Sequence, residues 1–148
     1  MLFGVIGGDR RQAELLKLLR QDGYQAAAYG TAGETDWERA VSAEVVVLPL
    51  PLCREGDTIN IEGEQRGIGA LLRQMRRNQL LLAGQVKPAQ AAEAAELDLN
   101  LIDYFKREEL TVANAAATAE GTVQVILERL ERSLLGSRCL VLGFGRIG

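Results

Sequence analysis

The chain begins with MLFGVIGGDRRQAELLKLLRQDG, residues 1–23, and this stretch decides the class of fold. Residues 2–6 are short and apolar and run into Gly7 and Gly8, as a buried strand entering a turn does. Residues 10–21 then carry leucines at helical spacing. A strand, a glycine turn and a helix therefore follow one another, which is the opening of an α/β protein.

The same alternation continues along the chain. Further strands are predicted by short apolar segments at residues 24–29, 45–48, 79–83 and 99–103. Helices are predicted between them at residues 36–42, 64–78 and 88–97. Segment 45–48 is valine-rich and uncharged, as is typical of a central parallel strand buried on both faces. We expect a three-layer, flavodoxin-like parallel sheet of order 2-1-3-4-5 with helices on both faces.

The last third of the chain predicts a long connecting helix and the first strand of a Rossmann domain. Helical spacing runs from Thr118, which is placed to cap the helix, to about residue 133. The flanking predictions are a helical turn at 106–110, an extended piece at 111–114 and a strand at 138–142. The resulting division is a flavodoxin-like domain at 1–117, an inter-domain helix at 118–135 and the start of a truncated NAD(P)-binding domain at 136–148.

The chain ends on a glycine fingerprint that follows the apolar segment 138–142. Its residues are Gly143, Gly145, Arg146, Ile147 and Gly148, and this spacing after a strand is typical of a turn that binds the pyrophosphate of NAD(P). The helix that normally follows supplies the N–H groups for the pyrophosphate, and it is not in this sequence. We therefore expect no cofactor bound to this chain alone.

Composition excludes several functions. The net charge is -3 with basic and acidic residues interspersed, which disfavours nucleic acid as a partner, and no apolar run is long enough to span a membrane. Cys53 and Cys139 fit no metal spacing and are predicted to be reduced thiols of a cytoplasmic protein. Since the chain has no histidine, acid–base chemistry here must use other side chains.

The candidate substrate-binding residues follow the predicted strands. Carboxyl ends of the first and third strands flank the point where the strand order reverses, and open α/β sheets bind ligands there. A second anion site is expected at the helix end marked by Thr118 and Glu120, with Gly121 allowing close backbone approach. The candidates at the strand ends are Gly7, Gly8, Asp9, Arg10, Arg11, Pro49 and Pro51.

These motifs together resemble the A-subunit family of bacterial dipicolinate synthase. Nearly the whole chain is covered, in order. The matching motifs are Val5-Ile6-Gly7-Gly8-Asp9-x-Arg11-Gln12, Leu48-Pro49-Leu50-Pro51, Asn114-Ala115-x-x-Thr118-x-Glu120-Gly121 and Gly136-Ser137-Arg138-x-x-Val141-Leu142-Gly143-Phe144-Gly145-Arg146-x-Gly148. This sequence departs from the family at Ala117, where proline is usual, and the stretch 53–64 does not align, which leaves Arg54, Asp57 and Thr58 without a role.

The resemblance implies the N-terminal domain of an NAD(P)-dependent oxidoreductase subunit, inactive by itself. Such a subunit forms dipicolinate from a dihydrodipicolinate-pathway intermediate during sporulation, and it works with the dipicolinate synthase B subunit. The implied substrate is a small dicarboxylate, and we expect a homo-oligomer. The resemblance does not identify the catalytic residues.

Two alternatives remain open, namely a non-catalytic assembly domain that docks the B subunit and the substrate domain of another enzyme similar to 2-hydroxyacid dehydrogenases. Two other classes with this sheet order fit less well. A receiver domain needs an acidic pair after the first strand and an aspartate after the third, where this chain has only Asp9 and Pro49. A flavodoxin needs hydroxyl residues in its first phosphate loop, and Gly7-Gly8-Asp9 has none.

Overall fold

The computed structural model describes residues 1–147, so the predicted role of Gly148 lies outside the described residues. The chain divides into two units, Met1–Phe105 and a second that begins at Lys106, and each is described by itself.

The first unit is built on a sheet in the order β3-β2-β1-β4-β5-β6. Its parallel strands pair in the predicted order 2-1-3-4-5, which is confirmed, and the sequence missed only the two-residue antiparallel strand at the edge. The strands are β1 (Leu2–Ile6), β2 (Gln25–Thr31), β3 (Glu34–Thr35), β4 (Val45–Val47), β5 (Leu80–Ala83) and β6 (Asn100–Asp103).

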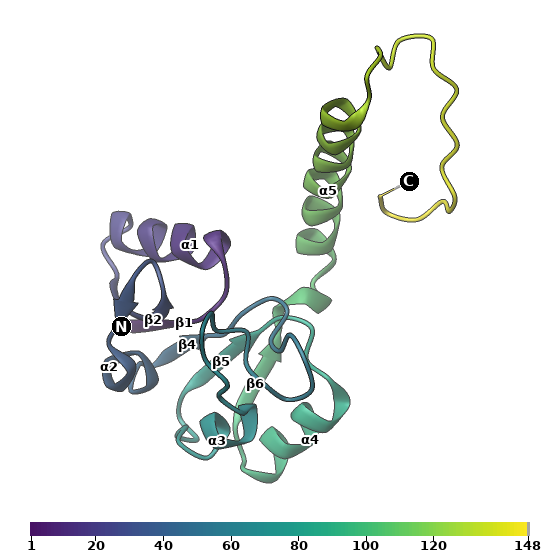
Figure 1. The fold of residues 1–148 in the computed structure, drawn as a ribbon. Helices are drawn as coiled ribbons and strands as arrows, with labels where there is room; N and C mark the ends of the chain where they lie inside the picture. The colour runs from purple at the N-terminus through teal and green to yellow at the C-terminus, as the bar shows by residue number, and fades with distance from the viewer. Residues whose placement is uncertain (148) are drawn as a thin grey trace. The chain divides into compact units, whose positions relative to one another are not determined.

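Helices cover both faces of this sheet, as predicted (Figure 1). Successive strand residues point to opposite faces, so Val5 packs with Leu16 of the first helix, whereas Ile6 packs with the larger core on the other side. The helices are α1 (Arg10–Gln21) on one face and α2 (Trp37–Val41), α3 (Ile68–Leu72) and α4 (Pro88–Glu96) on the other.

The predicted helix at 64–78 is much shorter in the structure. Before α3, Gly67 pairs with Thr58 in an isolated β-bridge, which holds the chain extended. After α3, buried Gln79 donates to Val41 O at 2.7 Å and Ala43 O at 2.6 Å and accepts from Arg76 N at 2.6 Å. These hydrogen bonds tie the tight turn leading into β5 to the connection between α2 and β4, and they override the helical spacing.

The second unit begins with α5 (Glu108–Arg129), a single helix that corrects two predictions. The extended piece at 111–114 is helical, and the long helix starts ten residues before Thr118. Glu108 and Glu109 favour a helix start in the first turn, and the alanines at 113 and 115–117 are the strongest helix formers, so the local β-branched residues do not interrupt the helix.

No strand forms at residues 138–142, where the sequence predicts one. Leu140 and Leu142 are more than four-fifths exposed. A strand requires a neighbouring strand for its hydrogen bonds, and the described part of the second unit offers none. Among residues 1–147, no helix is both long and apolar enough to cross a membrane.

Candidate functional site

The turn between β1 and α1 brings the predicted glycines into close contact with a distant loop. Gly7 has φ +63° and Gly8 has φ +88°, so both occupy the region that favours glycine. A Cβ on Gly7 would lie 2.6 Å from Asn60 O and 2.8 Å from Ile61 Cγ1. Gly8 N donates to Asn60 O at 2.7 Å. This donor is therefore used within the protein rather than offered to a phosphate.

Asp9 caps α1, as predicted. Its carboxylate accepts from Arg11 N at 2.9 Å, and Gln12 Oε1 accepts from Asp9 N at 3.3 Å, which completes a capping box. The first turn of α1 is therefore satisfied by its own side chains. Arg10, the other predicted basic residue, is exposed, and its side chain makes no hydrogen bond or ion pair with residues 1–147.

Arg11 is held by two neighbours at once. Its Nε donates to Asp9 Oδ1 at 3.0 Å, and its Nη2 donates to Asp9 Oδ2 at 2.8 Å and to Leu50 O at 2.5 Å. The hydrogen bonds from Arg11 lower the pKa of Asp9, so this carboxylate stays ionised. Nη1 donates to no acceptor within residues 1–147, and about half of the side chain is exposed. The guanidinium is thus fixed by Nε and Nη2, while Nη1 has no partner within residues 1–147.

The proline-containing segment after β4 is secured through its carbonyl groups. Every carbonyl from Leu48 to Leu52 accepts a hydrogen bond from another part of the first unit. The donors, in order, are Tyr104 Oη at 3.1 Å, Gly84 N at 3.1 Å, Arg11 Nη2 at 2.5 Å, Asn60 Nδ2 at 3.4 Å and Asn60 N at 2.9 Å. Pro49 and Pro51 therefore belong to a fixed segment at the carboxyl edge of the sheet, and their contact with a substrate stays a prediction.

Tyr104 completes this site, and the sequence reasoning missed it. It directly follows β6, at the same edge of the sheet as Arg11, so its position after a predicted strand was an available signal. Its hydroxyl donates to Leu48 O, and burial raises its pKa to about 12. The phenol is therefore protonated at neutral pH and acts as a hydrogen-bonding group rather than a base.

The loop between β4 and α3 packs across the carboxyl end of β1. Ile59 and Ile61 are almost fully buried, and Ile61 also lies where Cβ atoms on Gly7 or Gly30 would be. Beside them lies a hollow of about 540 Å³ that includes Arg54 and Thr58. Residues 53–64 therefore form part of the packing around the β1–α1 turn.

Cys53 at the start of this loop is a poor candidate nucleophile. The thiol is half-buried, and this burial raises its pKa, so it is protonated at neutral pH. Gln90 Nε2 donates to its sulfur at 3.3 Å. The side chain therefore serves the packing of α4 against the loop.

The predicted anion site at Thr118 and Glu120 is wrong. Both residues lie inside α5, and the Thr118 hydroxyl donates to Asn114 O at 2.7 Å, so no free helix N-terminus exists there. A Cβ on Gly121 would meet nothing within 4 Å, so the expected close approach is also absent from the described structure. The reason is the earlier start of α5.

The described part of the glycine fingerprint forms no cofactor cradle. Gly143 has φ +114°, but a Cβ on Gly143 or Gly145 would meet no atom within 4 Å. Arg146 pairs instead with Glu108 of the same unit, with Nη2 2.6 Å from Oε2. Ile147 is exposed. Residues 143–147 by themselves therefore do not fit a dinucleotide.

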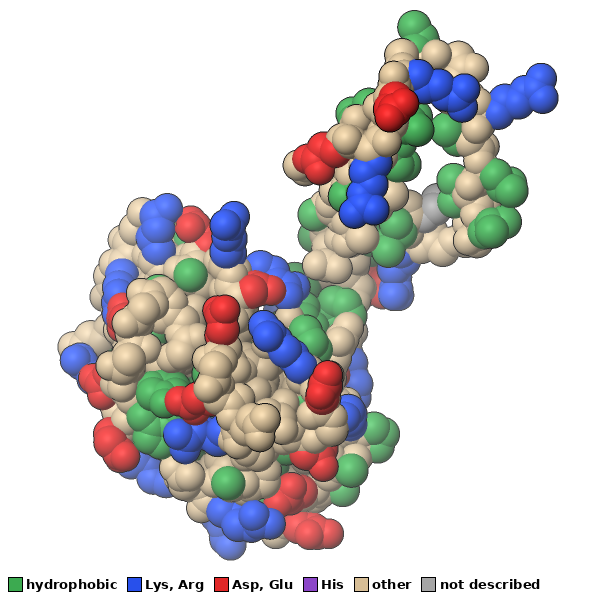
Figure 2. Space-filling view, in the orientation of Figure 1, with side chains coloured by type: hydrophobic (Ala, Val, Ile, Leu, Met, Phe, Trp, Pro, Cys, Tyr) green, Lys and Arg blue, Asp and Glu red, His purple; other side chains and the backbone are tan. Residues whose placement is uncertain are grey.

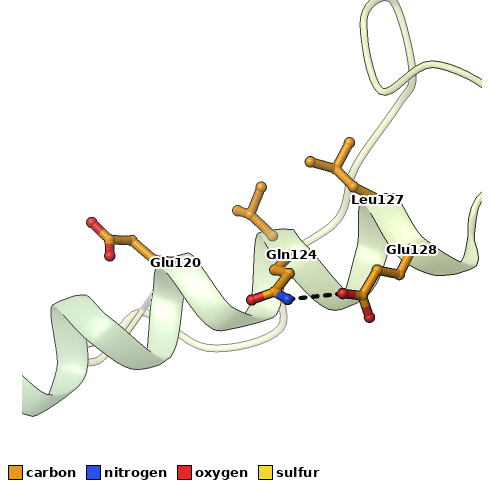
Figure 3. A pocket seen from close by; sticks show the side chains of 5 residues that line it. Glu120, Gln124, Leu127 and Glu128 are labelled. Carbon is orange, nitrogen blue, oxygen red and sulfur yellow. Dashed lines mark hydrogen bonds between the residues drawn. The ribbon is translucent and has the colours of Figure 1, made fainter.

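One face of α5 carries exposed apolar side chains. Val123 and Leu127 are about half-exposed and line a shallow hollow together with Glu120, Gln124 and Glu128 (Figure 3). Gln124 Nε2 donates to Glu128 Oε1 at 2.8 Å beside them. On the first unit, by contrast, basic and acidic side chains alternate over the face in view (Figure 2).

Comparisons with known proteins agree with this architecture. The A subunit of dipicolinate synthase from Bacillus subtilis (strain 168) is 24% identical over 163 residues, which cover 99% of this chain and 54% of that protein. The crystal structure of the B. subtilis protein superimposes with a TM-score of 0.71 at 21% identity, again over 99% of this chain and 54% of that one. The crystal structure of the A subunit from Bacillus halodurans superimposes with a TM-score of 0.74 at 20% identity, over 99% of this chain and 55% of that one.

The chain therefore spans about half the length of these relatives. The structural matches establish the shared fold. Residues 2–105 match the family model of the N-terminal domain of the dipicolinate synthase A subunit, and this match covers nearly all of the first unit. The chain belongs to the A-subunit family of dipicolinate synthase, as its N-terminal domain.

Proposed function

We propose that this chain forms the substrate side of an NAD(P)-dependent oxidoreductase subunit. The full-length subunit would form dipicolinate from a dihydrodipicolinate-pathway intermediate during sporulation, together with the B subunit and as a homo-oligomer. Family membership supports the reaction class. The observation that carries the substrate role is Arg11, whose guanidinium is fixed at the carboxyl edge of the sheet with its Nη1 edge free.

The crevice is suited to binding and orienting a carboxylate. Arg11 supplies charge and direction, and the ionised Asp9 prevents the guanidinium from rotating. Tyr104 keeps its proton at neutral pH and donates a hydrogen bond to Leu48 O, so its oxygen could accept a hydrogen bond from the substrate but not remove a proton from it. These residues would hold the substrate in a fixed orientation toward the reacting partner.

NAD(P) would supply the hydride acceptor in the full-length subunit. Because residues 143–147 do not form its cradle by themselves, the cofactor site is proposed to need the segment beyond this chain. No step of the reaction is assigned to those residues. Their role in this proposal is to begin the NAD(P)-binding domain.

The test is steady-state kinetics of the full-length subunit with a dihydrodipicolinate-pathway intermediate and NAD(P). Arg11→Gln should raise KM roughly ten- to a hundredfold, the range for loss of a charge-assisted hydrogen bond. Arg11→Lys should give a KM between those of Arg11→Gln and the wild type, because lysine carries the charge but lacks the planar pair of donors. Arg39→Gln, at an exposed arginine of α2 outside the proposed site, is the control and should leave KM unchanged. Turnover by residues 1–148 alone would contradict the division of the site between two domains.

The alternative assembly role has one observation in its favour. The apolar side chains of α5, Val123 and Leu127 among them, are exposed without a covering element in the described residues (Figure 3). Such a face is typical of an interaction surface. If Arg11→Gln leaves kinetics unchanged while Leu127→Ser abolishes association with the B subunit, the assembly role replaces the substrate role.

A further inference from the structure

The hollow beside the β4–α3 loop shares a wall with the Arg11 crevice. Ile61 lies against the Gly7 turn, where a Cβ would come within 2.8 Å of its Cγ1, and it also lines the hollow. The Gly7 turn leads directly into Asp9 and Arg11. Ile61 therefore connects the lining of the hollow to the turn that leads into Arg11.

The hollow combines an apolar base with a polar rim. Ile59 and Ile61 form the base, and both are almost completely buried. The polar residues of the lining are Arg54, Glu55, Thr58, Glu64 and Gln65. A volume of about 540 Å³ lies within the range of sites that bind small ligands.

The far wall of the hollow is held rigidly. Glu64 accepts a hydrogen bond from the Tyr29 hydroxyl, and Arg66 Nε donates to its other oxygen at 3.2 Å. The Arg66 guanidinium in turn stacks on Trp37, 3.9 Å from the ring centroid. This wall is thereby tied to β2 and α2, and the charge of Glu64 is offset by Arg66.

Arg54 is the basic group of the hollow. It is exposed and forms no ion pair with another side chain of residues 1–147. Its charge, with the larger contribution of Arg11, lowers the pKa of Asp9, so both guanidinium groups lie within electrostatic range of the same carboxylate. Glu55, the sequence neighbour of Arg54, lines the same hollow with the opposite charge, so Arg54 is the one basic group in a lining of mixed charge.

We propose that the hollow is a second subsite, in which Arg54 binds one carboxylate of a cyclic dicarboxylate while Arg11 binds the other and the ring lies on Ile59 and Ile61. The assignment rests on the proposed function, because that function makes the substrate a dicarboxylate. It adds a specificity-determining residue, Arg54, from the stretch for which the family resemblance gives no role.

The test compares two acids that differ by one carboxylate. Pyridine-2,6-dicarboxylate and pyridine-2-carboxylate are titrated into the 148-residue chain in metal-free buffer, and the dissociation constants are measured by NMR chemical-shift changes. The wild-type chain should prefer the diacid by about tenfold, from one partly exposed charge-assisted hydrogen bond. Methyl signals of Ile59 and Ile61 should shift with both acids, since the ring lies on them.

The variants separate the two proposals. Arg54→Gln should remove the preference for the diacid and leave binding of the monoacid unchanged, whereas Arg11→Gln should weaken both acids. Arg39→Gln, at an exposed arginine of α2, is the control and should bind as the wild type does. If Arg54→Gln keeps the preference while Arg11→Gln weakens both acids, the subsite is refuted and the proposed function stands. If both variants bind like the wild type, or the wild type binds neither acid, the subsite is refuted and the full-length kinetics alone decide the substrate role.

Discussion

The close approach of Asn60 to the Gly7 turn leads to a stability prediction with an internal control. Gly7→Ala places a side chain at φ +63°, which costs about 1–2 kcal/mol, and forces a Cβ to within 2.6 Å of a backbone oxygen. Relieving such overpacking costs about 1–3 kcal/mol. The free energy of unfolding should therefore fall by about 2–5 kcal/mol.

Gly33→Ala is the matched control. Gly33 has φ +76°, close to that of Gly7, but a Cβ there would meet nothing within 4 Å. This variant should lose only the backbone contribution, about 1–2 kcal/mol. The difference between the two variants isolates the contact of the β4–α3 loop with the β1–α1 turn.

Unfolding in guanidinium chloride, followed by tryptophan fluorescence, measures the free energy of unfolding of both variants. Trp37 is the only tryptophan and lies in the first unit, so the signal reports on that unit alone. Equal shifts of the unfolding midpoint for Gly7→Ala and Gly33→Ala would refute the reasoning. Such a result would mean that the β4–α3 loop does not lie against the β1–α1 turn in solution. The contact of Ile61 with the Gly7 turn, on which the second subsite depends, would then be refuted as well.

Three further predictions concern single side chains. Gly121→Ala should stabilise α5 by about 1 kcal/mol, measured as slower amide exchange in that helix, since the position is helical and open. Asp9→Asn keeps a capping side chain but loses the ion pair to Arg11. Because the pKa of Asp9 is lowered in the folded state, the wild type should be slightly more stable than the variant near neutral pH. Urea unfolding should show this difference disappear as the pH falls below about 4. Tyr104→Phe should lower the free energy of unfolding by about 1 kcal/mol, because Leu48 O loses its donor. It should also remove the tyrosine absorbance change near pH 12. The stability contributed by the Tyr104 phenol is fully present below about pH 10 and is lost as the pH rises through 12.

The sheet was predictable because its signals are local and agree with one another. Residues 2–6 and 45–48 are apolar, short and bounded by glycine or proline, and the helices between the strands are capped by residues such as Asp9 and Asp36. Parallel strands with helical crossovers then leave few topologies. The carboxyl-edge position of Gly7 and Pro49 follows from that topology.

The missed features depend on distant contacts. The helix at 64–78 is shortened by Gln79, whose partners are about 36–38 residues away in sequence. Tyr104 reaches Leu48 across 56 residues. The start of α5 differs from the prediction for a local reason. Thr111 and Val112 individually favour strands, whereas the surrounding alanines and glutamates favour a helix.

The arrangement after β4 explains why binding and stability are coupled at this site. Pro49 and Pro51 have no N–H groups, so the segment from Leu48 to Leu52 is held mainly by donors to its carbonyls. One of those donors is Arg11 Nη2, and the Nη1 of the same guanidinium has no partner within residues 1–147. A ligand that binds Nη1 would therefore also restrain Arg11 against Leu50. Conversely, loss of Arg11 should loosen the segment from Leu48 to Leu52 even without a ligand. The kinetic effect of Arg11→Gln must therefore be separated from its structural effect, and the partial rescue expected of Arg11→Lys does this.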